Sequence, residues 1–289
     1  MIVLGFIAGK VLKVDGRSVA ALMFYIIVPL VMADAVSRTT VTMGLLLLPL
    51  VVFSISTFMC LAFYAIGRRI WQDSMSNILG MAVGVANVGY FGLPLAILLL
   101  DEQGVGLYLT AIMGTNLFES SVGFYITAKG KHTSRDALLK VLKLPLLYAF
   151  FVGLAVSLLG WEFPVFVQET VGHMRGTYVV LGMMIIGLGL ANITSWKIGF
   201  RFMSLAMLAK FVLWPLIIGG VVWLDISWLH LFNDSMHKVL LLLSIMPLAA
   251  NTVAIATLLD THPDKVATTV LASTLFAMFY VPLMIMWLF

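Results

Sequence analysis

The stretch Met81–Leu100, MAVGVANVGYFGLPLAILLL, decides how this chain is interpreted. It is apolar enough to lie in a lipid bilayer, yet it contains Asn87, Gly89, Gly92 and Pro94. Because proline has no N–H to donate, it leaves a backbone carbonyl of the preceding turn without its helical partner. Inside a bilayer such a carbonyl must be satisfied by protein, ion or water. We therefore expect a helix broken at Pro94, the kind of element with which secondary transporters bind substrates.

Composition places the whole chain in the membrane. Hydrophobic residues make up 62% of the sequence and charged residues 10%, whereas soluble domains have about 25% charged residues. We predict an all-α polytopic membrane protein whose main environment is the lipid bilayer. The net charge of +4 does not indicate nucleic-acid binding, because basic residues in membrane proteins report orientation first.

A membrane-spanning helix needs about 20 apolar residues. On that basis we expect ten spans: Met1–Leu12, Val19–Val36, Met43–Ile66, Ser76–Leu100, Val105–Ala128, Leu138–Leu159, Val171–Ile193, Ile198–Leu224, His237–Leu259 and Val266–Phe289. The first would reach only about 18 Å as a helix. Either the sequence starts late within that helix, or the helix is short and packs inside the bundle.

The basic residues predict the orientation of these spans. If both termini lie outside, all 17 lysines and arginines fall on the inside except Arg38, Arg175 and Lys238, which lie outside, and Lys210, which lies within a span. Such a bias is typical of the cytoplasmic side. The polar linker 129–143, KGKHTSRDALLKVLK, is then cytoplasmic.

The same linker divides the ten spans into five and five. Because five is odd, the two halves would face opposite ways in the membrane, which is an inverted repeat. We predict a first repeat over 1–128, a linker over 129–137 and a second repeat over 138–289.

The fourth and ninth spans carry matching polar residues. Asn87 and Pro94 in the fourth correspond in order to Pro247 and Asn251 in the ninth, within Leu240–Leu259. An amide offers both donors and an acceptor, so two facing amides beside two breaks predict a substrate site. The alternative for each asparagine is a hydrogen bond between helices, typically worth about 0.6 kcal/mol.

Two ionisable residues lie deep within the predicted spans. An unpaired lysine such as Lys210 costs about 2.5–3.5 kcal/mol at a helix centre. Either Lys210 forms a salt bridge with Glu119, or it faces the crossing and compensates carbonyl ends or substrate. Glu119 also has two alternative roles, a structural pairing or proton coupling. Asp34, near the outer end of the second span, is expected to snorkel toward the boundary.

Several chemistries are absent from the sequence. It contains neither the phosphate-binding GxxxxGK[ST] pattern nor the zinc-binding HExxH pattern. The histidines fall in loops or at span ends. We therefore expect no enzymatic activity, no cofactor and no metal site.

Four segments resemble one family. ANVGYFGLPLAILL in the fourth span and MPLAANTVAIATLLDTHPDKVATTVLASTLFAMFYVPL at the end are the more specific, and GFIAGKVLKVDG and LMFYIIVPLVMADAV are looser. Together they resemble the auxin efflux carrier family, which includes plant PIN proteins and bacterial malonate and malate permeases. The resemblance covers nearly the whole chain.

The resemblance implies a ten-helix inverted repeat of the sodium/proton-antiporter type, in which broken helices four and nine cross beside the substrate. Carried over to this sequence, Asn87 and Asn251 are substrate or crossover residues, and Pro94 and Pro247 mark the crossings. Lys210 falls where family members often have a basic residue before a proline, here Pro215. The family moves organic anions. Without the long central loop of plant members, this chain looks like a bacterial inner-membrane protein.

The leading hypothesis is alternating-access transport of a small mono- or dicarboxylate, such as malonate or malate. The alternatives are a sodium-coupled bile-acid-type symporter and a passive channel or membrane sensor. Coupling to H+ or Na+, the direction of flux and the formation of a homodimer stay open at this stage.

Overall fold

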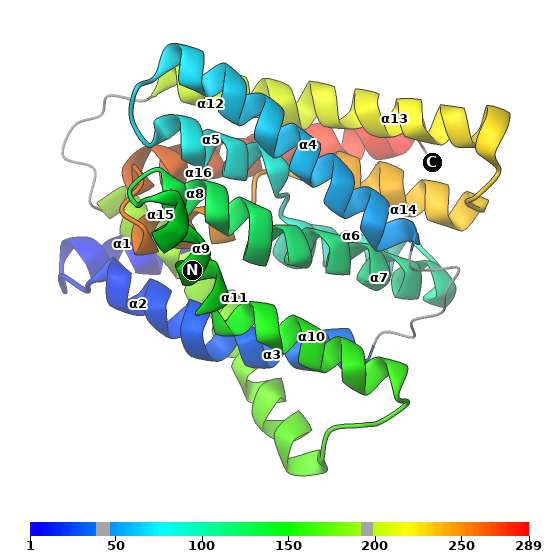
Figure 1. Ribbon diagram of the computed structural model, residues 1–289, viewed down its shortest axis with the longest axis horizontal. Helices are drawn as coiled ribbons and strands as arrows, with labels where there is room; N and C mark the ends of the chain where they lie inside the picture. Colours follow the sequence, from blue (N-terminus) through cyan, green and yellow to red (C-terminus); the bar gives the residue numbers. More distant parts are fainter. Residues whose placement is uncertain (39–46, 192–198, 289) are drawn as a thin grey trace.

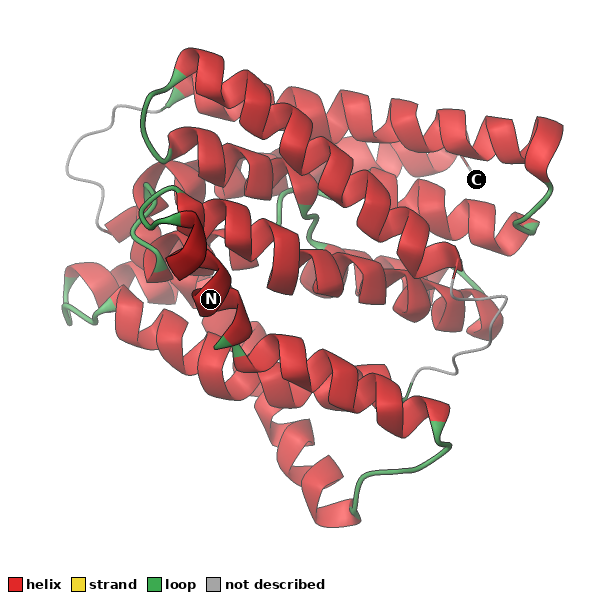
Figure 2. Ribbon diagram, in the orientation of Figure 1, coloured by secondary structure: helices red, strands yellow, loops and turns green. Residues whose placement is uncertain are grey.

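The computed structural model describes residues 1–38, 47–191 and 199–288, and every regular element among them is helical (Figures 1 and 2). The predicted span ends at Met43, Ile193, Ile198 and Phe289 lie outside the described residues. The first half contains α1 Ile2–Lys10, α2 Gly16–Leu22, η1 Met23–Ile27, α3 Val28–Ser37, α4 Leu47–Ile70, α5 Met75–Gly84, η3 Val88–Gly92, α6 Leu93–Leu99, α7 Glu102–Phe118, η4 Glu119–Gly123 and α8 Phe124–Lys129. The second half contains α9 Ser134–Leu142, α10 Pro145–Leu158, α11 Val165–Ala191, α12 Phe200–Leu208, η5 Ala209–Leu213, α13 Trp214–Leu224, η6 Asp225–Leu229, α14 Asp234–Ser244, α15 Asn251–Leu258 and α16 Pro263–Leu288.

Four continuous helical stretches among the described residues are long and apolar enough to cross a membrane: Gly16–Asp34, Leu47–Ile70, Phe200–Leu229 and Pro263–Leu288. The all-helical prediction is confirmed for the described residues. The stretch Phe200–Leu229 continues past the expected end at Leu224.

Short polar side chains set the starts of several helices. Asp15 accepts hydrogen bonds from two backbone N–H groups of α2, and Asp101 accepts one from Gly104 in α7. Asn233 accepts one from the backbone N–H of Met236 in α14. Thr133 caps α9, so the predicted polar linker contains a helix rather than running as a loop. Each cap satisfies an N–H that the first turn of a helix leaves without a partner.

The helices form two groups, visible in Figure 1 as a lower and an upper set. In the small bundle, α1, α2, α3, α10 and α11 pack on one another. In the large bundle, α4 to α8 pack with α12, α13 and α14, and α16 packs on α12 as well as on α11 of the small bundle. The helix α15 contacts α2 and α11 of the small bundle as well as α5 and α16 of the large one. Movement between the bundles would therefore act on α15 directly.

The first helix lies along α11 and is not enclosed. A Cβ on Gly5 would meet the backbone oxygen of Met184 at 2.0 Å, so only glycine allows this approach. On its other side Val3 is 69% and Leu4 51% exposed. Of the two alternatives for this segment, the short helix packed inside the bundle is not what the structure has, since Val3 and Leu4 are exposed.

Candidate functional site: two interrupted helices and their buried charges

Two helices of the large bundle are interrupted, and their interruptions touch. The helix α5 ends at Gly84 and α14 ends at Ser244, and each chain resumes as a helix several residues later. Between them, Ala86 and Leu248 form an antiparallel bridge. The N–H of Asn87 donates to the carbonyl of Pro247 at 2.8 Å. We call this contact, formed by residues 85–87 and 245–250, the crossing.

The crossing places helix ends of both signs together. The chain enters it at the C-terminal ends of α5 and α14, which carry partial negative charge, and leaves it at the N-terminal ends of η3 and α15, which carry partial positive charge. Such an arrangement offers backbone donors and acceptors at one place in an apolar protein. It is the local chemistry by which half-helices bind ions and small charged molecules.

Side chains of neighbouring helices satisfy the backbone groups that the breaks leave free. Trp214 of α13 donates its indole N–H to the carbonyl of Val83 at 2.8 Å. Tyr108 of α7 donates its hydroxyl to the carbonyl of Val88 at 3.0 Å. Ser273 of α16 accepts from the N–H of Leu248 at 2.9 Å. Sequence reasoning missed these partners, whose signal was a set of polar aromatic and hydroxyl groups within apolar spans.

The two glycines of the fourth span have different surroundings. A Cβ on Gly92 would come within 1.9 Å of the Tyr108 hydroxyl oxygen, so this glycine is required for the hydrogen bond to Val88. Gly89 is exposed, and a Cβ there would meet nothing within 4 Å. Gly92 therefore belongs to the packing of the break, and Gly89 leaves open space beside it.

The structure corrects the role expected of Pro94. The break lies at Val85–Asn87, well before the proline. Pro94 is exposed and lies within the helix that resumes after the break, two residues past the π turn η3, as Pro215 lies two residues past η5. Pro247, by contrast, lies in the crossing and provides the carbonyl that Asn87 contacts.

The two asparagines differ in their environment. Asn87 is buried, with 4% of its surface exposed, and its backbone rather than its side chain joins the two breaks. Asn251 begins α15 and is half-buried. Its side-chain N–H donates to the hydroxyl of Tyr178 on α11 at 3.3 Å, a contact between the large and small bundles. The Asn251 amide is also a hydrogen-bond partner of the Glu119 carboxyl.

Glu119 and Lys210 are both buried, and they form no ion pair in the described part of the chain. Of the two alternatives for Lys210, the salt bridge with Glu119 is therefore not formed. Lys210 is 1% exposed, its ammonium group has no hydrogen-bond partner, and it lies 4.4 Å from the ring centre of Trp214. The attraction of a cation for an aromatic face replaces only part of the hydration that the lysine loses.

Both charged residues lie in π-helical turns. Glu119 begins η4, and Lys210 lies within η5. Isolated π turns are rare and occur often at functional sites. At η5 the cause is visible: Pro215 cannot donate to the carbonyl of Phe211, and the hydroxyl of Tyr280 on α16 donates to that carbonyl instead, at 2.7 Å.

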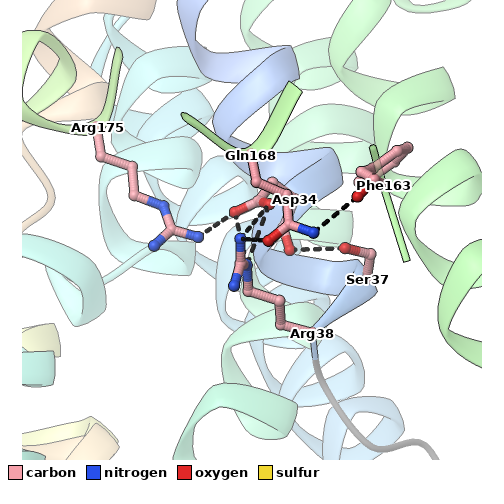
Figure 3. Close-up of polar contacts among 6 residues, drawn as sticks. All are labelled: Asp34, Ser37, Arg38, Phe163, Gln168 and Arg175. Atoms are coloured by element: carbon pink, nitrogen blue, oxygen red, sulfur yellow. Dashed lines mark hydrogen bonds and ion pairs between the residues drawn. The ribbon is translucent and has the colours of Figure 1, made fainter. Parts of the chain in front are cut away.

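Asp34 does not snorkel outward, in contrast to the sequence expectation. Its side chain is only 2% exposed and accepts from the guanidinium groups of Arg38 and Arg175, which are about half exposed (Figure 3). Arg38 also donates to Gln168 at 3.1 Å. Hydrogen bonding to Asp34 raises the pKa of the Arg38 guanidinium above its ordinary value. We call these four residues the Asp34 cluster; it joins α3 to α11 within the small bundle.

A second buried carboxylate is fully partnered. Asp225 of η6 accepts from the N–H groups of Leu231 and Phe232 and contacts the His237 ring at 2.9 Å. It fixes the turn between α13 and α14. Sequence reasoning placed Asp225 beyond the end of a span and so overlooked it.

These observations define a class: a polytopic membrane protein with two interrupted helices whose interruptions touch. The chain belongs to the membrane transport protein family, the family of the auxin efflux carriers, whose model matches residues 1–285. The predicted resemblance is thereby confirmed.

Two archaeal relatives are similar to this chain. An uncharacterized transporter of Methanocaldococcus jannaschii is 23% identical over 82% of this chain and 77% of its own length. An uncharacterized transporter of Methanothermobacter thermautotrophicus is 24% identical over 98% of this chain and 93% of its own. The family and both relatives therefore identify a membrane transporter.

Proposed function

We propose that this protein is a secondary transporter of a small organic anion, a mono- or dicarboxylate such as malonate or malate, and that the anion binds at the crossing. The observation that carries the proposal is the backbone contact between the two breaks, Asn87 to Pro247. A helix that only anchors a protein has no need of an interruption, and two interruptions in contact give a binding place at membrane depth.

Lys210 supports an anionic substrate. Its ammonium group is buried without a hydrogen-bond partner, and the indole beside it is the one that caps Val83 at the first break. A buried unpaired charge is costly unless an opposite charge joins it. A substrate carboxylate would supply that charge and lower the cost of both groups in the bound state.

The contacts between loops support the proposed topology, with ten spans in two inverted five-span repeats and both termini outside. Loops assigned to the cytoplasmic side touch one another: Arg17 and Lys131 both contact Asp260, and His262 contacts Asp73. The antiparallel sense of the bridge at the crossing is the relation that inverted repeats would give two equivalent segments. Location in a bacterial inner membrane is part of this proposal.

Alternating access would follow from motion of the large bundle against the small one. This motion would expose the crossing to each side of the membrane in turn. The helix α15 lies between the bundles, and Asn251 links it to Tyr178. A substrate bound beside Asn251 would therefore act on the contact between the moving parts.

The test is uptake of labelled malonate, malate and a panel of monocarboxylates into proteoliposomes containing the full chain, with and without Na+ and pH gradients. We expect saturable uptake of at least one labelled carboxylate, and we expect the same unlabelled carboxylate to inhibit that uptake. Uptake that depends strictly on Na+ and accepts bile acids would favour the symporter alternative. A linear, non-saturable flux would favour a passive channel and overturn the proposal.

A further inference from the structure

Glu119 presents one unsatisfied oxygen in a buried position. The residue is 5% exposed, and its Oε1 atom has no hydrogen-bond partner in the described structure. The neighbouring hydroxyl groups do not donate to it, because Ser120 donates to the backbone oxygen of Asn116 and Ser121 donates to that of Leu117. A buried acceptor without a donor costs about 1–3 kcal/mol, and more when it is charged.

Asn251 presents a second unsatisfied oxygen beside the first. Its amide is a hydrogen-bond partner of the Glu119 carboxyl, yet its own Oδ1 atom is buried without a donor. One of its two N–H groups donates to the hydroxyl of Tyr178 on the small bundle. The Oε1 atom of Glu119 and the Oδ1 atom of Asn251 are thus both acceptors without a donor. A single hydrogen atom on one of the two oxygens would let it donate to the other.

One proton supplies the missing donor. When H+ from water adds to the Glu119 carboxylate, the product is a carboxylic acid with one O–H donor, which the Oδ1 atom of Asn251 can accept. The added charge neutralises the carboxylate, so no net charge stays buried there. A metal ion satisfies such oxygens less well, because it needs a cage of several oxygen ligands rather than two.

Charged neighbours do not substitute for that proton. The elements packed against η4 are α4, α5, α7, α8 and α10. Of these, α5 has no titratable residue, and α4 and α8 carry their basic residues in their last turns, at Arg68, Arg69 and Lys129. The other titratable groups on these helices are Cys60, Tyr64, Glu102, Tyr108, Tyr125 and Tyr148. The packed segment α15, which carries Asn251, has none.

We propose that Glu119 binds the coupling proton of transport, and that Asn251 transmits its protonation state to Tyr178 on the small bundle. With Glu119 ionised, the two N–H groups of Asn251 serve the carboxylate and the Tyr178 hydroxyl together. With Glu119 protonated, the amide oxygen accepts from Glu119, and the amide must turn to present that oxygen, which moves its N–H groups relative to Tyr178. Proton binding thereby changes a hydrogen bond that joins the two bundles. This inference rests on the proposed function, because it assigns a coupling ion to the same crossing.

The direct test is infrared difference spectroscopy of the full-length protein in lipid nanodiscs, titrated from mildly alkaline to mildly acidic pH. We expect a carboxylic C=O band that appears on acidification and is lost in Glu119→Gln. The matched control, Glu169→Gln, removes an exposed carboxyl of α11 and should keep the band. If Glu119→Gln fails to fold, Glu119→Asp keeps the carboxyl but withdraws it from Asn251, and the band must shift in frequency.

Two further arms test the coupling. Tyr178→Phe removes the hydroxyl that accepts from Asn251 and should change the pH at which the Glu119 band appears. An unchanged titration would overturn the role of Asn251 as the link. Adding Na+ at constant pH should leave the band unchanged, and loss of the band on adding Na+ would overturn the proton in favour of a metal cation.

The band test is independent of transport. A titrating Glu119 band in a protein that moves no carboxylate would overturn the proposed function and leave the proton site intact. Saturable carboxylate uptake with no Glu119 band, and with no response to a pH gradient, would overturn the proton site and leave the proposed function intact.

Discussion

Buried charge is paired in the Asp34 cluster and unpaired at Glu119 and Lys210, outside the crossing. Asp34 is as buried as Glu119, but two guanidinium groups surround it and the cluster lies within one bundle. Glu119 and Lys210 are buried without an ion pair, each with a polar atom that lacks a partner. Fully paired charge stabilises one arrangement of helices, whereas unpaired charge favours whatever later binds to it. The first region therefore stabilises the fold, and a role in transport is proposed for the second.

The largest effect is expected at the crossing itself. Asn87→Ala and Asn251→Ala should each reduce carboxylate uptake to the background of empty liposomes, because both residues lie where the breaks meet. Membrane insertion should persist, since the contact between the breaks uses the backbone of Asn87. Uptake is measured per amount of inserted protein, and wild-type rates in either variant would refute the site.

A slightly smaller effect is expected from Lys210→Met, which removes the cation and keeps the apolar stem. Carboxylate uptake should fall at least about tenfold, which corresponds to about 1.4 kcal/mol of lost interaction. The melting temperature should hold or rise, because replacing an unpaired buried charge by an apolar side chain relieves a desolvation cost. A melting temperature that falls sharply would show that Lys210 is structural.

Asp34→Asn should give the opposite result. It weakens the charged hydrogen bonds to Arg38 and Arg175, and such bonds contribute about 1.5–3 kcal/mol each when fully buried. Since both guanidiniums are about half exposed, solvent screening places the expected loss near the low end of that range. The variant should melt earlier, while uptake per folded molecule stays within about twofold of wild type, a difference of under about 0.5 kcal/mol.

Two neighbouring glycines offer a matched pair of smaller effects. Gly92→Ala brings a methyl group against the Tyr108 hydroxyl and should destabilise the protein by about 1–3 kcal/mol, as overpacking does. Gly89→Ala meets no atom and should leave the melting temperature unchanged. If Gly89 borders the substrate, its variant should raise the KM for uptake, and an unchanged KM would place the substrate elsewhere.

The smallest effect is expected at the π turn beside Lys210. Tyr280→Phe removes the donor to the Phe211 carbonyl and should cost about 1 kcal/mol of stability. The urea midpoint of the detergent-solubilised protein reports this loss. A midpoint equal to that of the wild type would mean that water satisfies the carbonyl as well as the tyrosine does.

Apolar composition and the mixture of asparagine, glycine and proline in Met81–Leu100 were enough to predict an all-helical membrane protein with an interrupted fourth span. The position of the break was not predictable from Pro94, because this proline lies within the helix that resumes after the break, directly after the π turn Val88–Gly92 and Leu93. The break is fixed instead by tertiary partners, Trp214 and Tyr108, that a local reading of the chain does not bring together.

Charge pairing was the least predictable property. Lys210 and Glu119 were natural partners as a deep cation and a deep anion, but the helices set them apart. Asp34 looked like a boundary residue because Arg175, which partners it, lies 141 residues away. Pairing across such separations depends on which helices pack together, and the sequence of one span does not report that.

Anion binding at the crossing is tested most directly by comparing Lys210→Met with Asp34→Asn in one preparation, measuring labelled malonate and malate uptake and melting temperature for both. We predict lost uptake with unchanged or higher melting temperature for Lys210→Met, and retained uptake with lower melting temperature for Asp34→Asn. The reverse pattern, with an active Lys210→Met protein and an inactive but stable Asp34→Asn protein, would contradict the assignment of anion binding to the crossing.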